Sequence, residues 1–579
     1  MRIRRAWLPG LLGAALLAAT GGPAAAGASG ATGGGLVVGQ GLKLAAGDAG
    51  AGDEFGFDVD IDGATAIVGA PLENEQTGAA YVFVRDGDSW VQEAKLVAYD
   101  GLAGDRFGWS VALSGDTALV GAYLKDDGGI DGGAAYAFRR TGTTWASAVK
   151  LPRTAHRAQG QENFGVAVEI EGDRALVAAY LDDLDPGDAE VLPVGSVTVY
   201  ERAPAIGPGD VWTEGALLVA SDGAANDRFG RSIALSGDTA LIGAYQDDDG
   251  GNASGSAYVF VRGPSGWSEQ QKLVPQDHEA GDWFGYAVSL LGDRALIGAP
   301  LADLAGDASG AAITFTRSGT SWSEEGLLVH EDIAAGDEYG FATDLAGELA
   351  IVGARHDVNE LLTLGAAYVF RQSATRSVAF DDPVVLRAGD AEVDDEFGYA
   401  VATDGLGVVV GARFEDEGGD GAGAVYSYVV TPPPYRSYCP DEGLECPCQN
   451  QGLPGRGCDN SAGTGGVQLS ATQFLPDGEG GGSVLLVGTG FQPGSPTALA
   501  IRSRIPDTIG KPFGDGLLCL VFPIRRLRGG LASGGNVRIP LTHNAGADTF
   551  YYQLWYRNQP DFCDALLFNV SNGIAIDWP

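Results

Sequence analysis

The amino-acid sequence predicts an all-β fold, a seven-bladed β-propeller followed by a small disulfide-containing domain of the β-sandwich type. Three observations predict it. A seventeen-residue phrase at 107–123 recurs at 229–245 with only three differences, and looser copies begin at five other places, so the chain contains internal repeats. Most copies have the pattern of four short antiparallel strands, which is that of a propeller blade. All six cysteines lie after residue 434, where the composition changes.

Each repeat opens with an aromatic residue and a glycine and continues as a β-hairpin. In the copy at 229–245, apolar residues flank the turn Ser236-Gly237-Asp238, whose glycine can adopt the positive φ that two-residue hairpin loops require. The seven copies begin at Phe55, Phe107, Phe164, Phe229, Phe284, Tyr339 and Phe397. The glycines at their turns are Gly63, Gly115, Gly172, Gly237, Gly292, Gly347 and Gly405.

Further strands follow each hairpin. The third is an apolar run such as 257–261, and in five copies a fourth begins with a tryptophan: Trp90, Trp145, Trp212, Trp267 or Trp322. A sheet of this kind has two apolar faces, so neighbouring sheets must stack to bury them. We therefore expect the opening aromatic residues and the tryptophans to form the core between blades. The Gly-Ala pairs are expected where two sheets approach closely.

The N-terminus has the order of a secretory signal peptide over residues 1–26. Arg2, Arg4 and Arg5 precede an apolar run at 6–19, and small residues follow up to Ala26. A membrane anchor is disfavoured because the run is shorter than the roughly 20 residues needed to span a bilayer. The sequence thus predicts export, to the medium or the cell surface.

The ends of the repeat region predict how the ring closes. The seventh copy stops at the proline-rich linker 431–438 without a fourth strand. The segment 36–44 resembles the fourth-strand ending at 271–274, and an Ala-Gly-Asp sequence follows both. We therefore expect an N-terminal strand to complete the last blade of a propeller covering 36–430, which would remove an open sheet edge.

The tail at 439–579 predicts a small β domain. Short apolar runs are separated by glycine and proline. An even number of cysteines in an exported chain favours three disulfides, with fifteen possible connectivities. The cysteines are Cys439, Cys446, Cys448, Cys458, Cys519 and Cys563. A metal site at Cys446-Pro-Cys448 is the weaker alternative because no second pair has zinc-like spacing.

The formal net charge is −40, and almost all of it lies between the signal segment and the tail. Such a body repels nucleic acids and anionic membranes. In a four-stranded antiparallel blade, the connections between the second and third strands and from the fourth strand to the next blade emerge at the same end. Both kinds of connection are rich in Asp and Glu, so one end of the propeller is predicted to be strongly electronegative.

The acidic end has two interpretations: a solvated surface, or a site for divalent cations or a cationic partner. The candidate metal ligands are Asp126, Asp127, Asp131, Asp247, Asp248, Asp249, Glu415, Asp416 and Asp420. Their carboxylates suit calcium, which takes six to eight oxygen ligands, although no loop has regular ligand spacing.

The phrase Phe-Gly…Gly-Ala-Pro, at 55–71 and 284–300, resembles the FG-GAP repeat of integrin α-subunit propellers and of many bacterial surface proteins. The resemblance covers 36–430 and implies a seven-bladed propeller. In that family calcium binds an Asp-x-Asp-x-Asp-Gly loop between the two halves of the phrase. Here that interval holds tight turns such as 113–117, so the family's calcium site is not implied. Cys458-Asp-Asn-Ser-Ala-Gly and 553–557 look like a C-terminal module of secreted bacterial repeat proteins.

The sequence contains no Gly-x-Ser-x-Gly elbow, His-Glu-x-x-His helix or P-loop, and its five histidines are scattered. The first functional hypothesis is a secreted, non-catalytic binding or adhesion protein whose acidic face meets a protein, a polysaccharide or a cation, with calcium as the candidate cofactor. The second is an exported polysaccharide-degrading enzyme that uses carboxylates near the propeller axis. The third is a structural component of the cell envelope.

Overall fold

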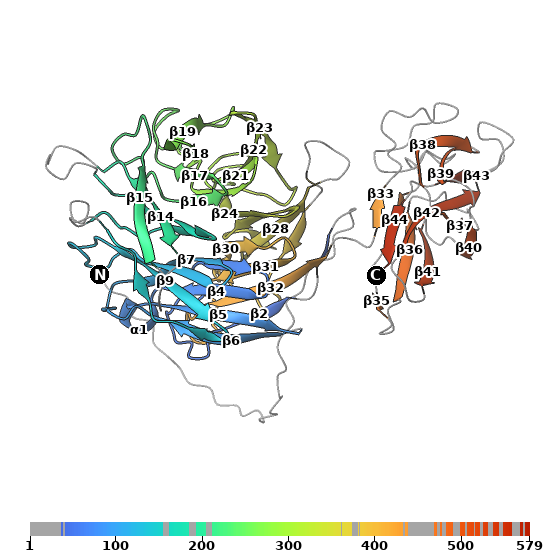
Figure 1. Cartoon of the computed structure of the whole chain (residues 1–579). Coiled ribbons are helices and arrows are strands. Elements are labelled where there is room, and N and C mark those ends of the chain that lie inside the picture. Colours follow the sequence, from blue (N-terminus) through green and yellow to red (C-terminus); the bar gives the residue numbers. More distant parts are fainter. Residues whose placement is uncertain are drawn as a thin grey trace, which may run out of the picture.

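The computed structural model describes the propeller over residues 36–38, 41–87, 89–153, 161–183, 193–203, 211–359, 362–372, 380 and 383–431, and in the tail the strands between 435 and 578. Seven antiparallel sheets follow one another around a common axis (Figure 1). The prediction of an all-β, seven-bladed propeller is confirmed. Within the described residues, no helix has the length and hydrophobicity needed to span a membrane.

The blades follow the repeats in chain order. Blade 1 is β3–β6 (Val59–Asp62, Thr65–Ala70, Ala79–Asp86, Ser89–Leu96). Blade 2 is β7–β11 (Phe107–Ser114, Thr117–Ala122, Ala134–Thr141, Thr144–Trp145, Val149–Lys150). Blade 3 is β12–β15 (Val168–Glu171, Arg174–Ala179, Ser196–Ala203, Val211–Leu218). Blades 4 and 5 are β16–β19 (Ile233–Ser236, Thr239–Ala244, Ser256–Gly263, Gly266–Leu273) and β20–β23 (Ala287–Leu291, Arg294–Ala299, Ala311–Ser318, Ser321–Leu328).

Blade 6 consists of β24 (Tyr339–Ala346), β25 (Leu349–Ala354), β28 (Ala366–Arg371) and β29 (Val384–Leu386). Its fourth strand, β29, lacks the tryptophan that marks this strand in five other blades. The loop after β25 contains a small extra hairpin, β26–β27 (Val358–Asn359, Leu362–Thr363), and the corresponding loop of blade 1 contains the short turn α1 (Glu73–Gln76).

Blade 7 confirms the predicted ring closure. Its strands β30 (Phe397–Thr403), β31 (Gly407–Ala412) and β32 (Ala424–Thr431) are completed by β1 (Val37–Val38) and β2 (Leu42–Leu44) from the start of the chain. Both pair with β32 in antiparallel orientation. Figure 1 shows the blue β2 beside the orange β32, so the first and last segments of the propeller share one sheet.

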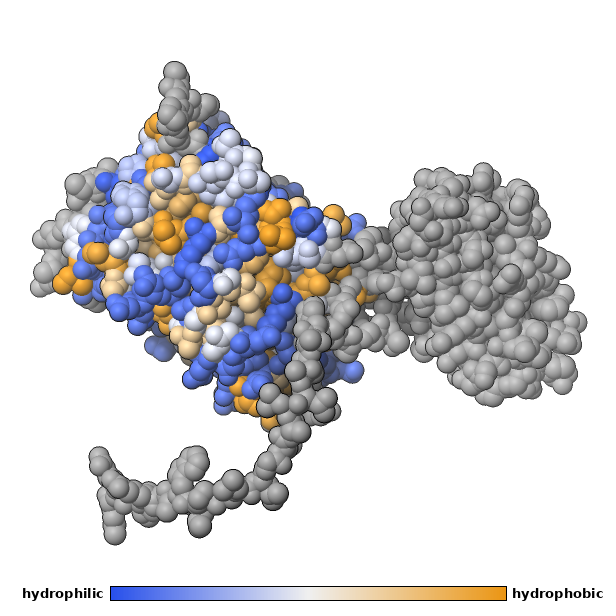
Figure 2. All heavy atoms as spheres, turned by 90° about the horizontal axis from the view of Figure 1, so that it is seen from below, coloured by the Kyte–Doolittle hydropathy of each residue, from blue (hydrophilic) through white to orange (hydrophobic). Residues whose placement is uncertain are grey.

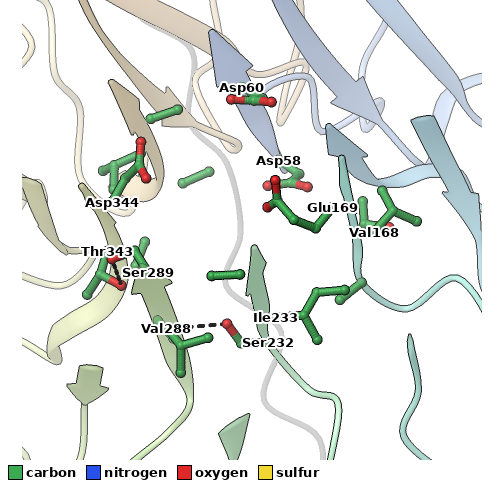
Figure 3. A pocket seen from close by; sticks show the side chains of 18 of the residues that line it. Asp58, Asp60, Val168, Glu169, Ser232, Ile233, Val288, Ser289, Thr343 and Asp344 are labelled. Carbon is green, nitrogen blue, oxygen red and sulfur yellow. Dashed lines mark hydrogen bonds between the residues drawn. The ribbon is translucent and has the colours of Figure 1, made fainter. Parts of the chain in front are cut away.

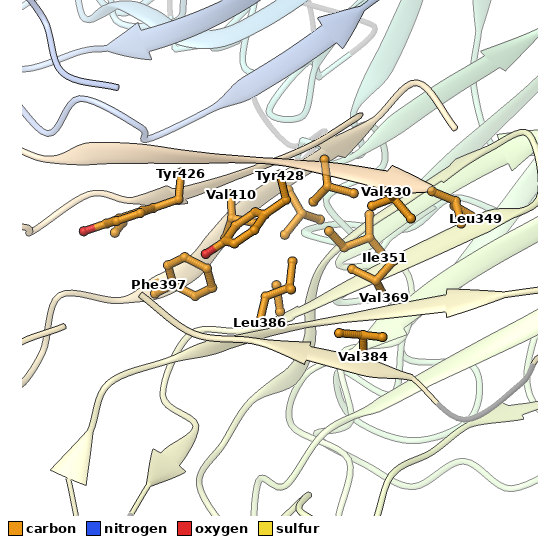
Figure 4. Packing of buried hydrophobic residues seen from close by; sticks show 14 of the residues in the cluster. Leu349, Ile351, Val369, Val384, Leu386, Phe397, Val410, Tyr426, Tyr428 and Val430 are labelled. Atoms are coloured by element: carbon orange, nitrogen blue, oxygen red, sulfur yellow. The ribbon is translucent and has the colours of Figure 1, made fainter. Parts of the chain in front are cut away.

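The hydrophobic core lies between neighbouring blades. One cluster joins Ile351 and Val369 of blade 6 to Val410 and Tyr426 of blade 7 (Figure 4). The aromatic residues that open the repeats are at most 2% exposed, as the repeat pattern predicts: Phe55, Phe107, Phe164, Phe229, Phe284, Tyr339 and Phe397. Trp212 and Trp322 are also buried, and the other three predicted tryptophans pack against the core while partly exposed.

The glycine of each opening Phe-Gly pair lies where two blades touch. Gly285 has a φ of 86°, and a Cβ there would lie 2.2 Å from the carbonyl oxygen of Ser256. Gly243, in the Gly-Ala pair of blade 4, would place a Cβ 1.9 Å from the oxygen of Gly285. Real Cβ atoms do not approach backbone that closely, so these positions need glycine.

In the tail, backbone pairing defines two larger sheets and one hairpin. They are built from β33 (Tyr435–Ser437), β34 (Gln468–Ala471), β35 (Leu475–Pro476), β36 (Gly482–Thr489), β37 (Ala498–Ser503), β38 (Pro506–Phe513), β39 (Gly516–Leu520), β40 (Arg525–Gly530), β41 (Asn536–His543), β42 (Asp548–Arg557), β43 (Phe568–Val570) and β44 (Ile574–Trp578). The β-sandwich with three disulfides stays a prediction, since the cysteine side chains lie outside the described residues. The signal segment 1–26 also lies outside them.

Candidate functional site

Two sets of loops meet at one end of the propeller, as the strand order predicts. The loop that enters each blade packs on the loop after the second strand of the preceding blade. The amide of Trp283 donates to the Ala253 carbonyl at 3.3 Å, and the amide of Glu338 donates to the Ala308 carbonyl at 3.2 Å. We call this the acidic end, because these loops contain the predicted clusters of Asp and Glu.

The opposite end also has acidic turns, but arginines neutralise many of them. Arg140 pairs with Asp116 at 2.8 Å and Arg317 pairs with Asp293 at 2.6 Å, each within one blade. Arg371 pairs with Glu348 in the same way. The two ends of the propeller therefore differ in charge balance. In the view of Figure 2, hydrophilic residues cover much of the visible propeller surface, and hydrophobic residues lie among them in separate groups.

The predicted metal ligands of blade 4 surround a lysine. Lys272 Nζ lies 2.8 Å from Asp247, 2.6 Å from Asp249 and 2.9 Å from Asp222 of the preceding loop. Burial alone would lower the pKa of Lys272, but its hydrogen bonds to these carboxylates raise it, so the ammonium stays charged. Asp248 is not in this cluster; its carboxylate accepts the Ala253 amide.

A second lysine occupies the same place in blade 7. Lys43 Nζ of β2 lies 2.6 Å from both Glu415 and Glu417 and 2.9 Å from Asp390. The oxygens of these three carboxylates lie close enough together to hold a metal ion, but the ammonium already lies among them. Asp416 is not in this cluster; its carboxylate accepts the Gly421 amide at 2.7 Å.

The third predicted loop, in blade 2, follows the same plan. Lys150 lies 2.6 Å from Asp100 and 3.2 Å from Asp127. Asp126 accepts the backbone amide of Asp131 at 3.0 Å. The lysines were not singled out from the sequence, although a signal was present: a Lys-Leu pair ends the fourth strand at 43–44, 95–96, 150–151 and 272–273.

A polar channel of about 420 Å³ runs along the propeller axis. The first strand of every blade contributes to its wall. Figure 3 shows Asp58 and Asp60 of blade 1, Glu169 of blade 3 and Asp344 of blade 6 around the cavity. Among the described residues, none of these four carboxylates forms an ion pair. From the sequence, carboxylates near the axis are expected only in general terms, without particular residues.

Three of the four channel carboxylates, Asp58, Asp60 and Asp344, fasten neighbouring blades together. The innermost strand of each blade is an edge of its sheet, so its backbone amides on the axis side have no neighbouring strand to accept them. Side chains of the preceding blade accept these amides instead. Asp60 accepts the Leu113 amide at 2.6 Å and Asp344 accepts the Thr403 amide at 2.7 Å. Ser232 does the same for Val288 at 2.9 Å. Such bonds satisfy edge groups that would otherwise lack partners.

Burial raises the pKa of the channel carboxylates. It brings the pKa of Asp58 and Asp60 to about 7 and that of Asp344 to about 6, while hydrogen bonds from backbone amides pull in the opposite direction. The pKa of Glu169 is raised well above its usual value by burial and by the charges of Asp60 and Asp344. The channel therefore holds carboxyl groups that gain protons near neutral pH.

These shifts predict an unusual pH dependence of stability. A carboxyl group that binds its proton more tightly in the folded state adds stability as the pH falls from its folded pKa to its unfolded pKa, about 3.9 for Asp. We expect the free energy of unfolding to increase as the pH falls from about 7.5 to about 5. Urea unfolding across this range measures it, and Asp60→Asn should reduce the slope. A wild-type stability that instead falls over this range would contradict the assignment.

The channel mouth at the acidic end is lined by aromatic rings. The ring of Phe57 lies 4.3 Å from that of Trp109 and 5.1 Å from that of Tyr399, measured between centroids. Phe341 continues the series, 5.1 Å from Tyr399 and 5.0 Å from Tyr286. All five residues stand two positions after the aromatic residue that opens their repeat. One position of the repeat therefore supplies most of the aromatic lining of the mouth.

On the side of blades 6 and 7, ion pairs neutralise the mouth. Arg355 lies 2.7 Å from Glu338, and Arg413 lies 2.7 Å from Glu396. His356 lies between the two carboxylates, 3.2 Å from Glu338 and 3.4 Å from Glu396. These two hydrogen bonds raise the pKa of His356 to about 9, so its ring is charged at neutral pH.

Comparisons with known proteins agree with the repeat structure. The family model described as FG-GAP repeat matches residues 38–83, 90–138, 212–260, 267–315, 322–370 and 381–428, which together make up half of the chain. No curated protein sequence matches the chain.

Two solved structures are similar at low identity. One is the β-propeller domain of the Trilobed protease from Pyrococcus furiosus, with 9% identity, a TM-score of 0.34 and coverage of 61% of this chain and 90% of that one. The other is the acylaminoacyl peptidase of Pyrococcus horikoshii, with 8% identity, a TM-score of 0.32 and coverage of 62% of this chain and 48% of that one.

Proposed function

The chain belongs to the FG-GAP repeat family, and we propose that it is a secreted, non-catalytic binding protein whose acidic end meets a cationic partner at the cell surface or in the matrix. The observation that carries this proposal is the charge difference between the two ends of the propeller. Arginines neutralise many of the acidic turns at one end, whereas the loops at the other keep a surplus of carboxylates. Complementary charge raises the rate of association and orients the partner.

Part of the surplus consists of exposed carboxylates that have no partner inside the described part of the propeller. Asp277, Asp307 and Asp420 lie in three different loops of the acidic end and are exposed. Within the described part of the chain, none of their carboxylates has a hydrogen bond or an ion pair. They are therefore available to a partner without breaking contacts inside the propeller.

Matched charge variants test the acidic end. One variant combines Asp277→Asn, Asp307→Asn and Asp420→Asn; the control combines Asp86→Asn, Asp116→Asn and Asp293→Asn at the opposite end. With an immobilised lysine-rich peptide as probe, the first variant should bind about fivefold more weakly than wild type, since each exposed charge contributes a few tenths of a kcal/mol. The control should stay within about twofold. Equal losses in both variants would show that net charge alone matters.

Calcium at the acidic loops stays a prediction. In all three predicted loops a lysine ammonium lies among the carboxylates, so an ion would have to compete with it. The measurement is the melting temperature in chelator and then in millimolar calcium. An increase with calcium would support the prediction, and no change in either condition would contradict it.

Lys272→Met is a variant in which calcium should have a larger effect on stability. Removing the ammonium leaves Asp222, Asp247 and Asp249 facing one another, which should destabilise the fold by about 2–3 kcal/mol, since the site is partly exposed. Calcium should then restore more stability to the variant than to wild type. Arg262→Met, in the same blade but at the opposite end, is the control that should not respond to calcium.

A second candidate function is a polysaccharide-degrading enzyme, because Asp58, Asp60, Glu169 and Asp344 place carboxyl groups with raised pKa on the axis. Backbone amides donate hydrogen bonds to both carboxylate oxygens of Asp58, Asp60 and Asp344. A panel of polysaccharides separates the two functions. Retention without product supports binding, and product release that one carboxylate substitution abolishes supports catalysis.

A further inference from the structure

One half of the channel mouth, on blades 2 to 5, carries three arginines without a carboxylate partner. They are Arg106, Arg228 and Arg231. Among the residues that the structure describes, none of their guanidinium groups forms an ion pair, although the chain has 76 acidic residues and 36 basic ones. The arginines of the other half, Arg355 and Arg413, are paired with Glu338 and Glu396.

Tyrosines connect the three arginines into one surface. Arg106 Nη1 donates to Tyr123 Oη at 3.0 Å, and the Arg228 guanidinium lies 5.0 Å from the centre of the Tyr180 ring. Arg231 Nη2 donates to the hydroxyl of Tyr286 at 2.9 Å. We call this surface the arginine–tyrosine arc; its members are Arg106, Tyr123, Tyr180, Arg228, Arg231, Tyr245 and Tyr286.

The ring of Tyr245 lies 5.4 Å from that of Tyr286, and the Arg231 guanidinium lies 4.5 Å from the centre of the Tyr286 ring, so the arc continues through these residues. Burial raises the pKa of Tyr245, while the charges of Arg231 and Arg228 lower it. The pKa of Tyr123 is likewise raised by burial and then lowered by Arg106. Both hydroxyls therefore remain protonated at neutral pH and can donate hydrogen bonds.

One buried atom shows that the arc has unused hydrogen-bonding capacity. Arg106 Nε is buried and has no hydrogen-bond partner within the described residues. Two acidic residues near the arginines of the arc already have other partners. Glu54 pairs with Arg413, and Asp58 accepts two backbone amides.

We propose that the arginine–tyrosine arc binds the carboxylate of a uronic-acid sugar at the mouth of the channel. A guanidinium group matches a carboxylate with two parallel hydrogen bonds. Aromatic rings flank the arc: the ring of Trp109 lies 4.3 Å from that of Tyr123, and the ring of Trp283 lies 5.2 Å from that of Tyr245, so a sugar bound here would meet apolar surface as well as charge. Deeper in the channel, Ser232 Oγ accepts the Val288 amide, and its O–H can donate to a sugar hydroxyl.

The size of the channel and the charge around it agree with a ligand of this class. The channel volume of about 420 Å³ lies in the range of small-molecule sites, and Arg231 and Tyr286 of the arc line the channel. A polyanion such as a nucleic acid would meet the surrounding carboxylates of the acidic end, whereas one carboxylate per sugar ring can be neutralised locally by the arc. This site differs from the exposed loops of the proposed function and does not depend on them.

Calorimetric titration of the full chain tests the proposal with galacturonate, its methyl ester, galactose and N-acetylglycine. Galacturonate should bind about tenfold or more tightly than the ester and galactose, because only it carries both the charge and the ring. Equal affinity for all three sugars, or no binding of galacturonate, would overturn the proposal. Binding of N-acetylglycine as strong as that of galacturonate would assign the site to peptide carboxylates instead.

Variants locate the site. Arg231→Gln and Tyr286→Phe should each weaken galacturonate binding, by about tenfold and about threefold respectively, and Arg231→Lys should recover part of the loss. Arg262→Gln, at the opposite end, should bind like wild type, and identical affinities throughout would place the ligand elsewhere. If Arg231→Gln does not fold, the wild-type comparison of acid and ester still decides the question. The acidic-end triple variant should keep its galacturonate affinity, which separates this site from the proposed function.

Discussion

Gly285→Ala should abolish stable folding of the propeller, with a loss of about 4–5 kcal/mol or more. The new Cβ would lie 2.2 Å from the carbonyl oxygen of Ser256 and 3.1 Å from its carbonyl carbon, and both are backbone atoms that cannot rotate away. The residue would also be held at a φ of 86°, which L-residues rarely adopt. Soluble yield and urea unfolding measure the effect.

Gly292→Ala is the matched control for that substitution. Gly292 lies in the hairpin turn of the same blade, has a φ of 57° and would place its Cβ in open space. It shares the backbone strain but not the clash, so a loss of only about 1–2 kcal/mol is expected. If both variants lost the same amount of stability, the backbone conformation, and not the contact between blades, would explain why position 285 needs glycine.

Leu44→Ala should cost about 2–5 kcal/mol, because Leu44 is 3% exposed and β2 closes the ring. Deletion of residues 36–46 should cost more, since it removes the fourth strand of blade 7 together with Lys43. Thermal or urea unfolding of both proteins measures the losses.

Leu42→Ala is the control on the same strand. Leu42 lies two residues before Leu44 on β2 and is 38% exposed, so its truncation should change stability by about 0.5 kcal/mol or less. An unaltered stability after deletion of 36–46 would contradict ring closure by the N-terminal strand.

Blade number and ring closure could be predicted from the sequence because their determinants are local. A hairpin such as 233–244 lies within twelve consecutive residues and repeats, and the closing strand 36–44 resembles a fourth strand elsewhere in the chain. The fourth strand of blade 6 lacked this advantage, since Val384–Leu386 carries neither the tryptophan nor the Lys-Leu pair.

The lysine clusters and the channel could not be predicted in the same way. Lys272 meets Asp247 of its own blade and Asp222 of the loop that enters that blade only once the sheet has formed, because these residues are 25 and 50 positions away in the chain. Asp60, Glu169 and Asp344 stand at equivalent positions of blades 1, 3 and 6, which the ring brings to one axis. Predicting such groups requires an alignment of the repeats against one another, followed by closure of the ring.

Closure by β1 determines how the propeller can be tethered. Val37 pairs with Thr431, so the chain enters and leaves the propeller at neighbouring points of one blade. These points lie where the third strand ends and the fourth begins, which is the end away from the acidic loops. A tether through either flanking segment would therefore attach at the end opposite the acidic loops, and these carboxylate-rich loops would face away from the point of attachment.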